Sequence, residues 1–168
     1  MAAEEAGGSL TLTPIGIIHT PYTEPQGTPV QPAGGKDIEG RIEVFPAYAE
    51  GLTDLDGFSH IIVLFHFDRA AEGPLQCMPY MDDTVRGVFA TRSPRRPNPI
   101  GFSVVRLDRI EENVLHIRDL DILDGTPLLD IKPWVPPFDD PGEVRLGWLT
   151  ERAARVEEAR DDGRFSRE

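Results

Sequence analysis

Apolar and polar residues alternate over several short stretches of this sequence. Residues 41–45 alternate with a period of two, which predicts a strand with one face in solvent. Residues 58–68 form the most apolar stretch and predict a buried central strand. With the shorter stretches included, the pattern predicts about seven strands, drawn from residues 10–19, 41–45, 58–68, 87–90, 101–109, 114–118, 120–123 and 127–131.

Turn-forming residues separate these stretches. Glu111-Glu112-Asn113 predicts a hairpin turn after residues 101–109, and Asp124-Gly125 predicts a second hairpin, between residues 120–123 and 127–131. Residues 20–37 hold four prolines and three glycines and predict a long loop, of a kind that is usually functional or disordered in a compact domain. Three prolines preclude regular structure in residues 91–99.

The pattern changes at residue 147. Leu149, Ala153, Val156 and Ala159 stand at helical spacing among charged residues, so we expect one amphipathic helix there. Many strands followed by one helix predict a mainly β fold, a small antiparallel sheet or barrel with a C-terminal helix. The expected organisation is a disordered N-terminus (1–9), one β domain (10–146), and a C-terminal helix and tail (147–168).

The charge of the chain argues against a nucleic acid partner at first sight. Lys and Arg total 17 against 29 Asp and Glu, a formal net charge of -12, whereas nucleic acid binding depends on basic residues that neutralise phosphates. The average hides a local exception. Between Arg86 and Arg109 there are six arginines and one acid, Asp108, which gives that stretch a charge of +5.

Other features restrict the location of the protein. The longest apolar run, residues 61–65, is far shorter than the roughly 20 residues that span a bilayer. The acidic start of the chain does not resemble a signal peptide. A single cysteine, Cys77, excludes an internal disulfide and is typical of a reducing compartment. We therefore expect a cytoplasmic protein without a membrane segment, in which Cys77 is an incidental thiol rather than a nucleophile.

Two clusters of charged residues could bind a ligand. Prolines hold residues 91–99 extended, so Arg92, Arg95 and Arg96 are presented on a stiff loop that suits a carboxylate or a phosphate; the alternative is a surface loop paired with acids. The acids within residues 119–130 lack the spacing of a calcium loop, and one of them could hold a ribose diol instead.

A histidine-based metal site is not expected either. His60 and His66 share one face of their strand but lie roughly 20 Å apart, which is too far for one ion. We therefore predict no metal.

The most specific signal is a set of motifs. Residues 87–101 (GVFATRSPRRPNPIG), 120–127 (LDILDGTP) and 130–133 (DIKP) closely resemble the TsaA-like family, also called TrmO. Residues 16–21, 31–32 and 58–60 match further family positions in order, so the resemblance covers roughly residues 10–137. It implies a small antiparallel β-barrel that differs from Rossmann methyltransferases.

The resemblance also implies an activity. Members of this family are S-adenosylmethionine-dependent methyltransferases that methylate N6 of threonylcarbamoyladenosine at position 37 of tRNA, and they form homodimers. Matched to this sequence, the motifs place the cofactor against Pro32, Ala33, Gly34, Asp68, Arg69, Arg92, Phe102, Arg118, Asp119, Leu120 and Asp121.

The resemblance suggests substrate contacts as well. Asn98 precedes a proline as the catalytic asparagine of amino-methyltransferases does, and it is our candidate to orient the amine; a turn-forming Asn-Pro pair is the alternative. Arg95, Arg96 and Lys132 are the candidate tRNA contacts. Two other functions stay open, namely methylation of a small molecule and a non-catalytic module that binds S-adenosylmethionine or RNA.

Overall fold

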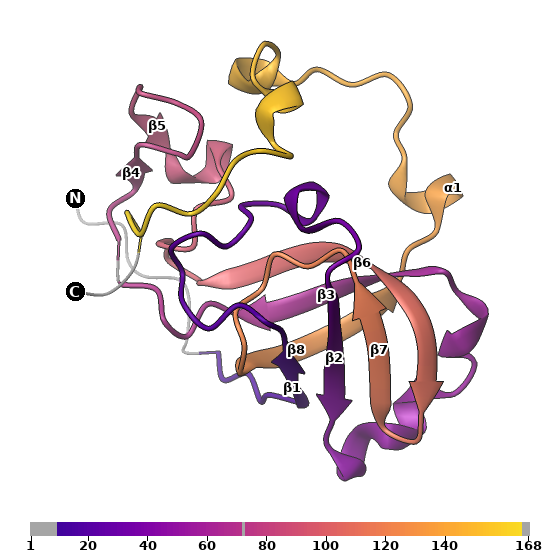
Figure 1. Ribbon diagram of the computed structural model, residues 1–168. Coiled ribbons are helices and arrows are strands. Elements are labelled where there is room, and N and C mark those ends of the chain that lie inside the picture. Colours follow the sequence, from indigo (N-terminus) through magenta and orange to yellow (C-terminus); the bar gives the residue numbers. More distant parts are fainter. Residues whose placement is uncertain (1–9, 72, 166–168) are drawn as a thin grey trace.

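Six antiparallel strands close into a barrel in the computed structural model, which describes residues 10–71 and 73–165 (Figure 1). The predicted disorder of residues 1–9 lies outside the described residues. Around the barrel the strand order is β1-β2-β7-β6-β3-β8. The strands are β1 Gly16–His19, β2 Glu39–Val44, β3 His60–His66, β6 Ile100–Glu111, β7 Val114–Arg118 and β8 Thr126–Pro133, and β4 Gln76–Cys77 and β5 Arg86–Gly87 form a separate pair.

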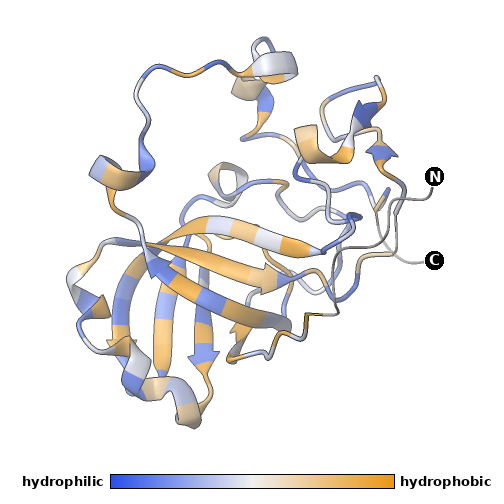
Figure 2. Ribbon diagram, turned by 180° about the vertical axis from the view of Figure 1, so that it is seen from behind, coloured by the Kyte–Doolittle hydropathy of each residue, from blue (hydrophilic) through white to orange (hydrophobic). Residues whose placement is uncertain are grey.

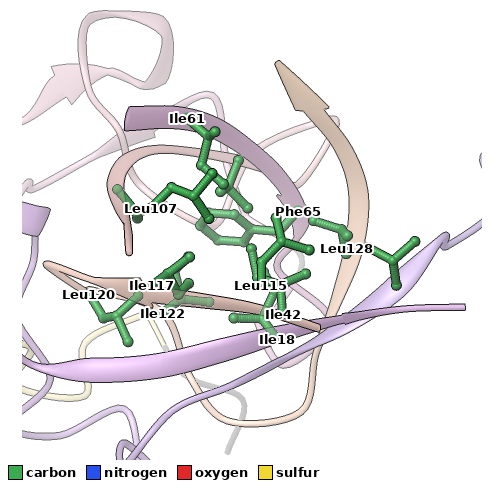
Figure 3. Packing of buried hydrophobic residues seen from close by; sticks show 13 residues of the cluster. Ile18, Ile42, Ile61, Phe65, Leu107, Leu115, Ile117, Leu120, Ile122 and Leu128 are labelled. Carbon is green, nitrogen blue, oxygen red and sulfur yellow. The ribbon is translucent and has the colours of Figure 1, made fainter. Parts of the chain in front are cut away.

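The alternation seen in the sequence decides which side chains fill the barrel. In β3, Ile61, Val63 and Phe65 are buried, whereas Ile62 and Leu64 between them are only half-buried. β3 pairs with both β6 and β8, so the predicted strand is confirmed, but a closed barrel has no central strand. Figure 2 shows the same alternation along the other strands, and Figure 3 shows the inward side chains packed together. Closure gives each of the six barrel strands a partner on both sides.

The helices among the described residues are short. They are the α-helix α1 Pro136–Asp139 and the 3₁₀ turns Pro32–Gly35, Pro46–Leu52, Leu55–Gly57, Val88–Ala90, Gly147–Leu149 and Ala153–Arg155. Within the described ranges, no helix has the length and apolar character needed to cross a membrane.

The predicted hairpin at Asp124-Gly125 is wrong. Asp119 adopts a left-handed conformation (φ 67°), and the chain leaves β7 to cross the end of the barrel, where Leu120 and Ile122 are buried in the core. The backbone N–H groups of Asp124 and Gly125 donate to carbonyls of the β1 strand and the loop after it. The turn residues therefore direct β8 to pair with β1, not with residues 120–123.

The predicted C-terminal amphipathic helix is also wrong. Residues 147–158 form successive 3₁₀ turns whose N–H groups mostly donate to the carbonyl three residues earlier. A segment of this length is marginal as an isolated helix, so its contacts with other parts of the chain determine its conformation. In Figure 1 the chain arches from α1 to this segment and then returns toward β4 and β5.

Candidate functional site

A large cavity opens at one end of the barrel. Its volume is about 980 Å³, at the upper end of the range for small-molecule sites. Phe65 at the end of β3, Phe102 in β6 and Thr126 at the start of β8 form its barrel side. Loops and the C-terminal segment form the rest, namely residues 28–31, 67–70, 79–81, 89–94, 96–98, 121–123 and parts of 148–165.

The proline-rich loop is fixed by its own hydrogen bonds. Thr91 and Ser93 are buried, and the Thr91 hydroxyl donates to the Val88 carbonyl and accepts from the Ser93 N–H. The Arg96 guanidinium donates to the carbonyls of Thr91 and Ser93. The loop therefore holds one shape, and Arg92, Arg96 and Asn98 on it all border the cavity.

Arg92 connects this loop to two other walls of the cavity. Its guanidinium donates to the side-chain carbonyl of Gln31 (2.7 Å) and lies 5.6 Å from the centre of the Phe102 ring. Since Gln31 precedes the Pro32–Gly35 turn and Phe102 belongs to β6, one side chain joins the first long loop, the proline-rich loop and the barrel. Arg92 itself remains exposed to solvent.

Asp121 is a carboxyl group in the cavity lining whose pKa is strongly raised. Its carboxylate accepts a 2.7 Å hydrogen bond from the hydroxyl of Ser103, a buried residue of β6. Burial raises the pKa of Asp121 to about 7, although the hydrogen bond from Ser103 and the charge of Arg92 act in the opposite direction. The carboxyl is therefore close to half-ionised at neutral pH, which is common for groups at functional sites.

Asp68 and Arg69 both line the cavity, directly after β3. The Arg69 guanidinium donates to the carbonyl of Thr23 (3.0 Å) and to that of Asp124 (2.7 Å). Arg69 thus ties the first long loop to the segment that carries Asp121, and these bonds give it a structural role in holding the site together.

The remaining predicted cofactor residues gather beside the cavity rather than in its lining. The Leu120 N–H donates to the Gly35 carbonyl, and the Asp119 carboxylate accepts from the Asp37 N–H. The turn with Pro32, Ala33 and Gly34 therefore packs next to residues 118–120. Leu120 belongs to the core, and Arg118 pairs on the outside of the barrel with Asp108 and Glu39.

Only some of the candidate substrate residues lie at the cavity. Arg96 and Asn98 border the cavity, whereas Arg95 lies beside them in the same loop but outside the lining. Lys132 lies six residues beyond Thr126 along β8, toward the other end of the barrel, where it pairs with Asp130 (2.7 Å). Within one chain, the structure does not bring Lys132 to the cavity.

The +5 stretch is not one patch. Three of its six arginines pair with carboxylates, as Arg86 with Asp82, Arg106 with Asp37, and Arg109 with Glu111. Those that line the cavity, Arg92 and Arg96, donate to neutral oxygen atoms.

Sequence reasoning missed several aromatic side chains of the cavity wall, among them Tyr80, Phe89, Trp148 and Phe165. A signal for part of this wall existed, because the spacing of Leu149, Ala153 and Val156 indicates one apolar face, and all three line the cavity.

No metal site is evident within residues 10–71 and 73–165, where no three His, Cys, Asp or Glu residues are grouped to hold an ion. His60 and His66 stand at opposite ends of β3. Cys77 is half-buried, with its sulfur 3.6 Å from the hydroxyl of Thr91.

Known proteins resemble this chain in sequence. The profile of the tRNA-methyltransferase O N-terminal domain matches residues 17–140. A Pyrococcus abyssi protein named "Probable S-adenosyl-L-methionine-binding protein" is 59% identical over 152 residues, which are 90% of this chain and 83% of that protein. The tRNA (adenine(37)-N6)-methyltransferase of Escherichia coli K12 is 40% identical over 132 residues, 73% of this chain but only 56% of that enzyme.

A solved structure has the same fold. The crystal structure of TrmO from Pseudomonas aeruginosa matches with a TM-score of 0.71 at 38% identity, over 84% of this chain and 63% of that chain. The barrel expected from the motifs is therefore confirmed. Because the family profile covers well over half of the sequence, the chain belongs to the tRNA-methyltransferase O N-terminal domain family.

Proposed function

We propose that this protein is an S-adenosylmethionine-dependent methyltransferase that methylates N6 of threonylcarbamoyladenosine at position 37 of tRNA. The observation that carries the proposal is the cavity, where Asp68, Arg92, Phe102 and Asp121 come together from four separate segments of the matched region. Family membership and the name of the Escherichia coli relative support the choice of acceptor. The match covers only 56% of that enzyme. Methylation of tRNA by this chain is therefore proposed from the similarity and needs its own test.

The residues in the cavity fit this cofactor. The Asp121 carboxylate, held by Ser103, can accept hydrogen bonds from a ribose hydroxyl or an ammonium group. The planar guanidinium of Arg92 suits the carboxylate of the methionyl part. Phe102, which is 42% exposed, supplies aromatic surface for an adenine ring. When bound, S-adenosylmethionine supplies a methyl group on a positively charged sulfonium.

The protein's own contribution would be mainly orientation. Pro97 and Pro99 fix the backbone on both sides of Asn98, so its side-chain carbonyl could accept a hydrogen bond from the acceptor amine and hold the nitrogen in one direction. Asp121 is ionised above its raised pKa of about 7 and would then favour a positively charged ligand. Arg95, Arg96 and Lys132 are the proposed contacts with tRNA.

We also include a cytoplasmic homodimer in the proposal. Pro32, Ala33, Gly34 and residues 118–120 pack beside the cavity rather than in it, so a site limited to the lining of one chain would leave these motif residues without a ligand contact. A second subunit adjoining this surface would enclose these motif residues in a shared site and give them a contact with the ligand.

A second candidate is a protein that binds S-adenosylmethionine without methylating tRNA. It is favoured by the name of the Pyrococcus abyssi relative, which states binding only, and which this chain matches over most of its length. The net charge of -12 would also suit a small-molecule acceptor.

Two measurements separate these functions. Calorimetry with S-adenosylmethionine tests the cofactor, and absence of binding at millimolar ligand would exclude both candidates. Nucleoside mass spectrometry of tRNA that carries threonylcarbamoyladenosine, incubated with protein and cofactor, tests the acceptor. We expect a gain of one methyl group on that nucleoside; cofactor binding with an unchanged nucleoside would favour the second candidate.

A further inference from the structure

The C-terminal segment forms a wall of the cavity, although it lies outside residues 17–140 that match the family. Its apolar residues facing the cavity are Trp148, Leu149, Ala153, Val156 and Phe165. Most polar groups of the cavity belong to other segments, among them Asp121 after β7 and Arg92 in the proline-rich loop, and the C-terminal segment adds Asp161. The cavity thus combines a polar part made by these loops with a mainly apolar part made by the C-terminal segment.

Contacts at several points hold this wall in place. Arg160 forms an antiparallel bridge with Pro29, reinforced by hydrogen bonds from the Gly27 N–H to the Asp161 carbonyl and from the Asp161 N–H to the Thr28 carbonyl. Phe165 is buried, with its ring 4.9 Å from that of Tyr80. The wall is therefore fixed to two loops that themselves border the cavity.

A third attachment involves an ion pair. The carboxylate of Asp82 contacts Arg86 of β5 at 2.9 Å and Arg152 of the C-terminal segment at 3.4 Å. The Asp82 side chain has no exposed surface, whereas the side chains of Arg86 and Arg152 are 30% and 32% exposed. This bridge joins the C-terminal segment to the strand that leads into the proline-rich loop.

Two contacts hold Trp148 in this wall. Its indole N–H donates to the Ala90 carbonyl at 2.8 Å, and the guanidinium of Arg86 lies 5.5 Å from the centre of its ring. Phe89, which precedes Ala90 in the chain, borders the same cavity with 77% of its surface exposed. A fixed indole and an exposed phenyl ring form a surface on which a nucleobase can stack.

We propose that Trp148 binds the acceptor, because its indole ring forms the surface against which the acceptor adenine packs, while the cofactor occupies the polar part of the cavity. The inference rests on the proposed function and adds a residue to it. The cavity of about 980 Å³ is at the upper end of the range for small-molecule sites, which leaves room for an acceptor base beside the cofactor. An indole fixed by Ala90 stacks on an adenine ring without having to be ordered first.

Kinetics of Trp148 variants test the inference. We expect Trp148→Leu to raise the KM for tRNA about ten-fold, the usual scale for loss of one stacking side chain, with the affinity for S-adenosylmethionine within two-fold of wild type. Trp148→Phe should recover most of the loss, because an aromatic ring is kept. Trp134→Leu is the matched control, since Trp134 lies outside the cavity lining, and should leave both values unchanged. Equal losses for cofactor and tRNA, or no change in KM, would overturn the inference.

Fluorescence gives a test that does not depend on turnover. The chain has two tryptophans, so Trp134→Phe leaves Trp148 as the single reporter. With S-adenosylhomocysteine at saturation, an anticodon stem-loop RNA carrying threonylcarbamoyladenosine should change the Trp148 emission, whereas the same RNA should leave the emission of Trp148→Phe unchanged. Unchanged Trp148 emission in a protein that methylates tRNA would refute the role of Trp148 and leave the proposed function intact. Lack of methylation would refute the proposed function instead.

Discussion

Substitution of Asp121 by asparagine should reveal the energetic cost of its carboxyl group. In the folded protein burial raises the pKa of Asp121 from 3.8 to about 7. Below pH 3.8 the group is protonated in both the folded and the unfolded chain, so it adds no pH dependence. As the pH rises, the unfolded chain loses this proton first, so the free energy of unfolding falls until the folded group also ionises near pH 7.

The magnitude follows from these two pKa values. Linkage gives a destabilisation of up to about 2 kcal/mol at pH 5 and about 4 kcal/mol at pH 8. The amide that replaces the Asp121 carboxyl would keep an oxygen that accepts the hydrogen bond from Ser103, and it would not ionise. The free energy of unfolding of Asp121→Asn minus that of wild type should therefore increase by about 2 kcal/mol between pH 5 and pH 8. Any effect of the new amide that does not depend on pH leaves this increase unchanged.

Urea denaturation at pH 5, 6, 7 and 8 measures this difference. Asp130→Asn removes one negative charge from a side chain that is 44% exposed, and it controls for the change in net charge. A difference between Asp121→Asn and wild type that stays constant over this pH range would refute the reasoning, because it would mean that Asp121 is already ionised at pH 5 in the folded protein.

Three further outcomes are expected. Gly35→Ala should destabilise the fold by about 1–3 kcal/mol in urea denaturation, since its Cβ would lie 1.8 Å from the Leu120 carbonyl oxygen; stability equal to wild type would contradict this packing. Arg92→Ala should weaken binding of S-adenosylmethionine by about 1–3 kcal/mol in calorimetry. Arg41→Ala, on β2 outside the cavity lining, should leave the affinity unchanged. Unaltered affinity of the Arg92 variant would show that Arg92 does not bind the carboxylate of the cofactor. Ile61→Ala should cost about 2–5 kcal/mol because the side chain is fully buried, and half-buried Ile62→Ala should cost less; similar losses would argue against the inward orientation of Ile61.

The strands of the barrel were largely predictable because their side chains alternate between core and solvent. The hairpin of β6 and β7 was predicted together with its turn, where Glu112 adopts a φ of 54°. Asp124-Gly125 also forms a turn, with Gly125 at a φ of 79°, but a local signal does not identify the partner of the next strand. Closure of the barrel decides that β8 pairs with β1, a contact between residues more than one hundred positions apart.

The sequence predicted those site residues that lie in or next to the family motifs. Arg92, Phe102 and Asp121 were selected from the sequence, and the structure brings them to one cavity. The place of Trp148 in the same cavity depends on its bond to Ala90, 58 residues earlier, and no local pattern encodes such a contact. The spacing of Leu149, Ala153 and Val156 correctly indicated an apolar face but wrongly indicated a long helix, because a series of 3₁₀ turns can also present every third or fourth residue to one side.

The arrangement of charge decides where an acidic protein could accept tRNA. An arginine already paired with a carboxylate must give up that pair to neutralise a phosphate, so the pairs of Arg86, Arg106 and Arg109 reduce the basic surface expected from the sequence. Arg92 and Arg96 donate to neutral oxygen atoms, and those contacts leave their charge uncompensated. Both line the cavity with Arg69, and Asp68, Asp121 and Asp161 line it too, so the cavity lacks the excess of negative charge that the whole chain carries. The net charge of -12 then acts mainly as a restriction, because it opposes nucleic acid over the rest of the surface and favours binding at this cavity.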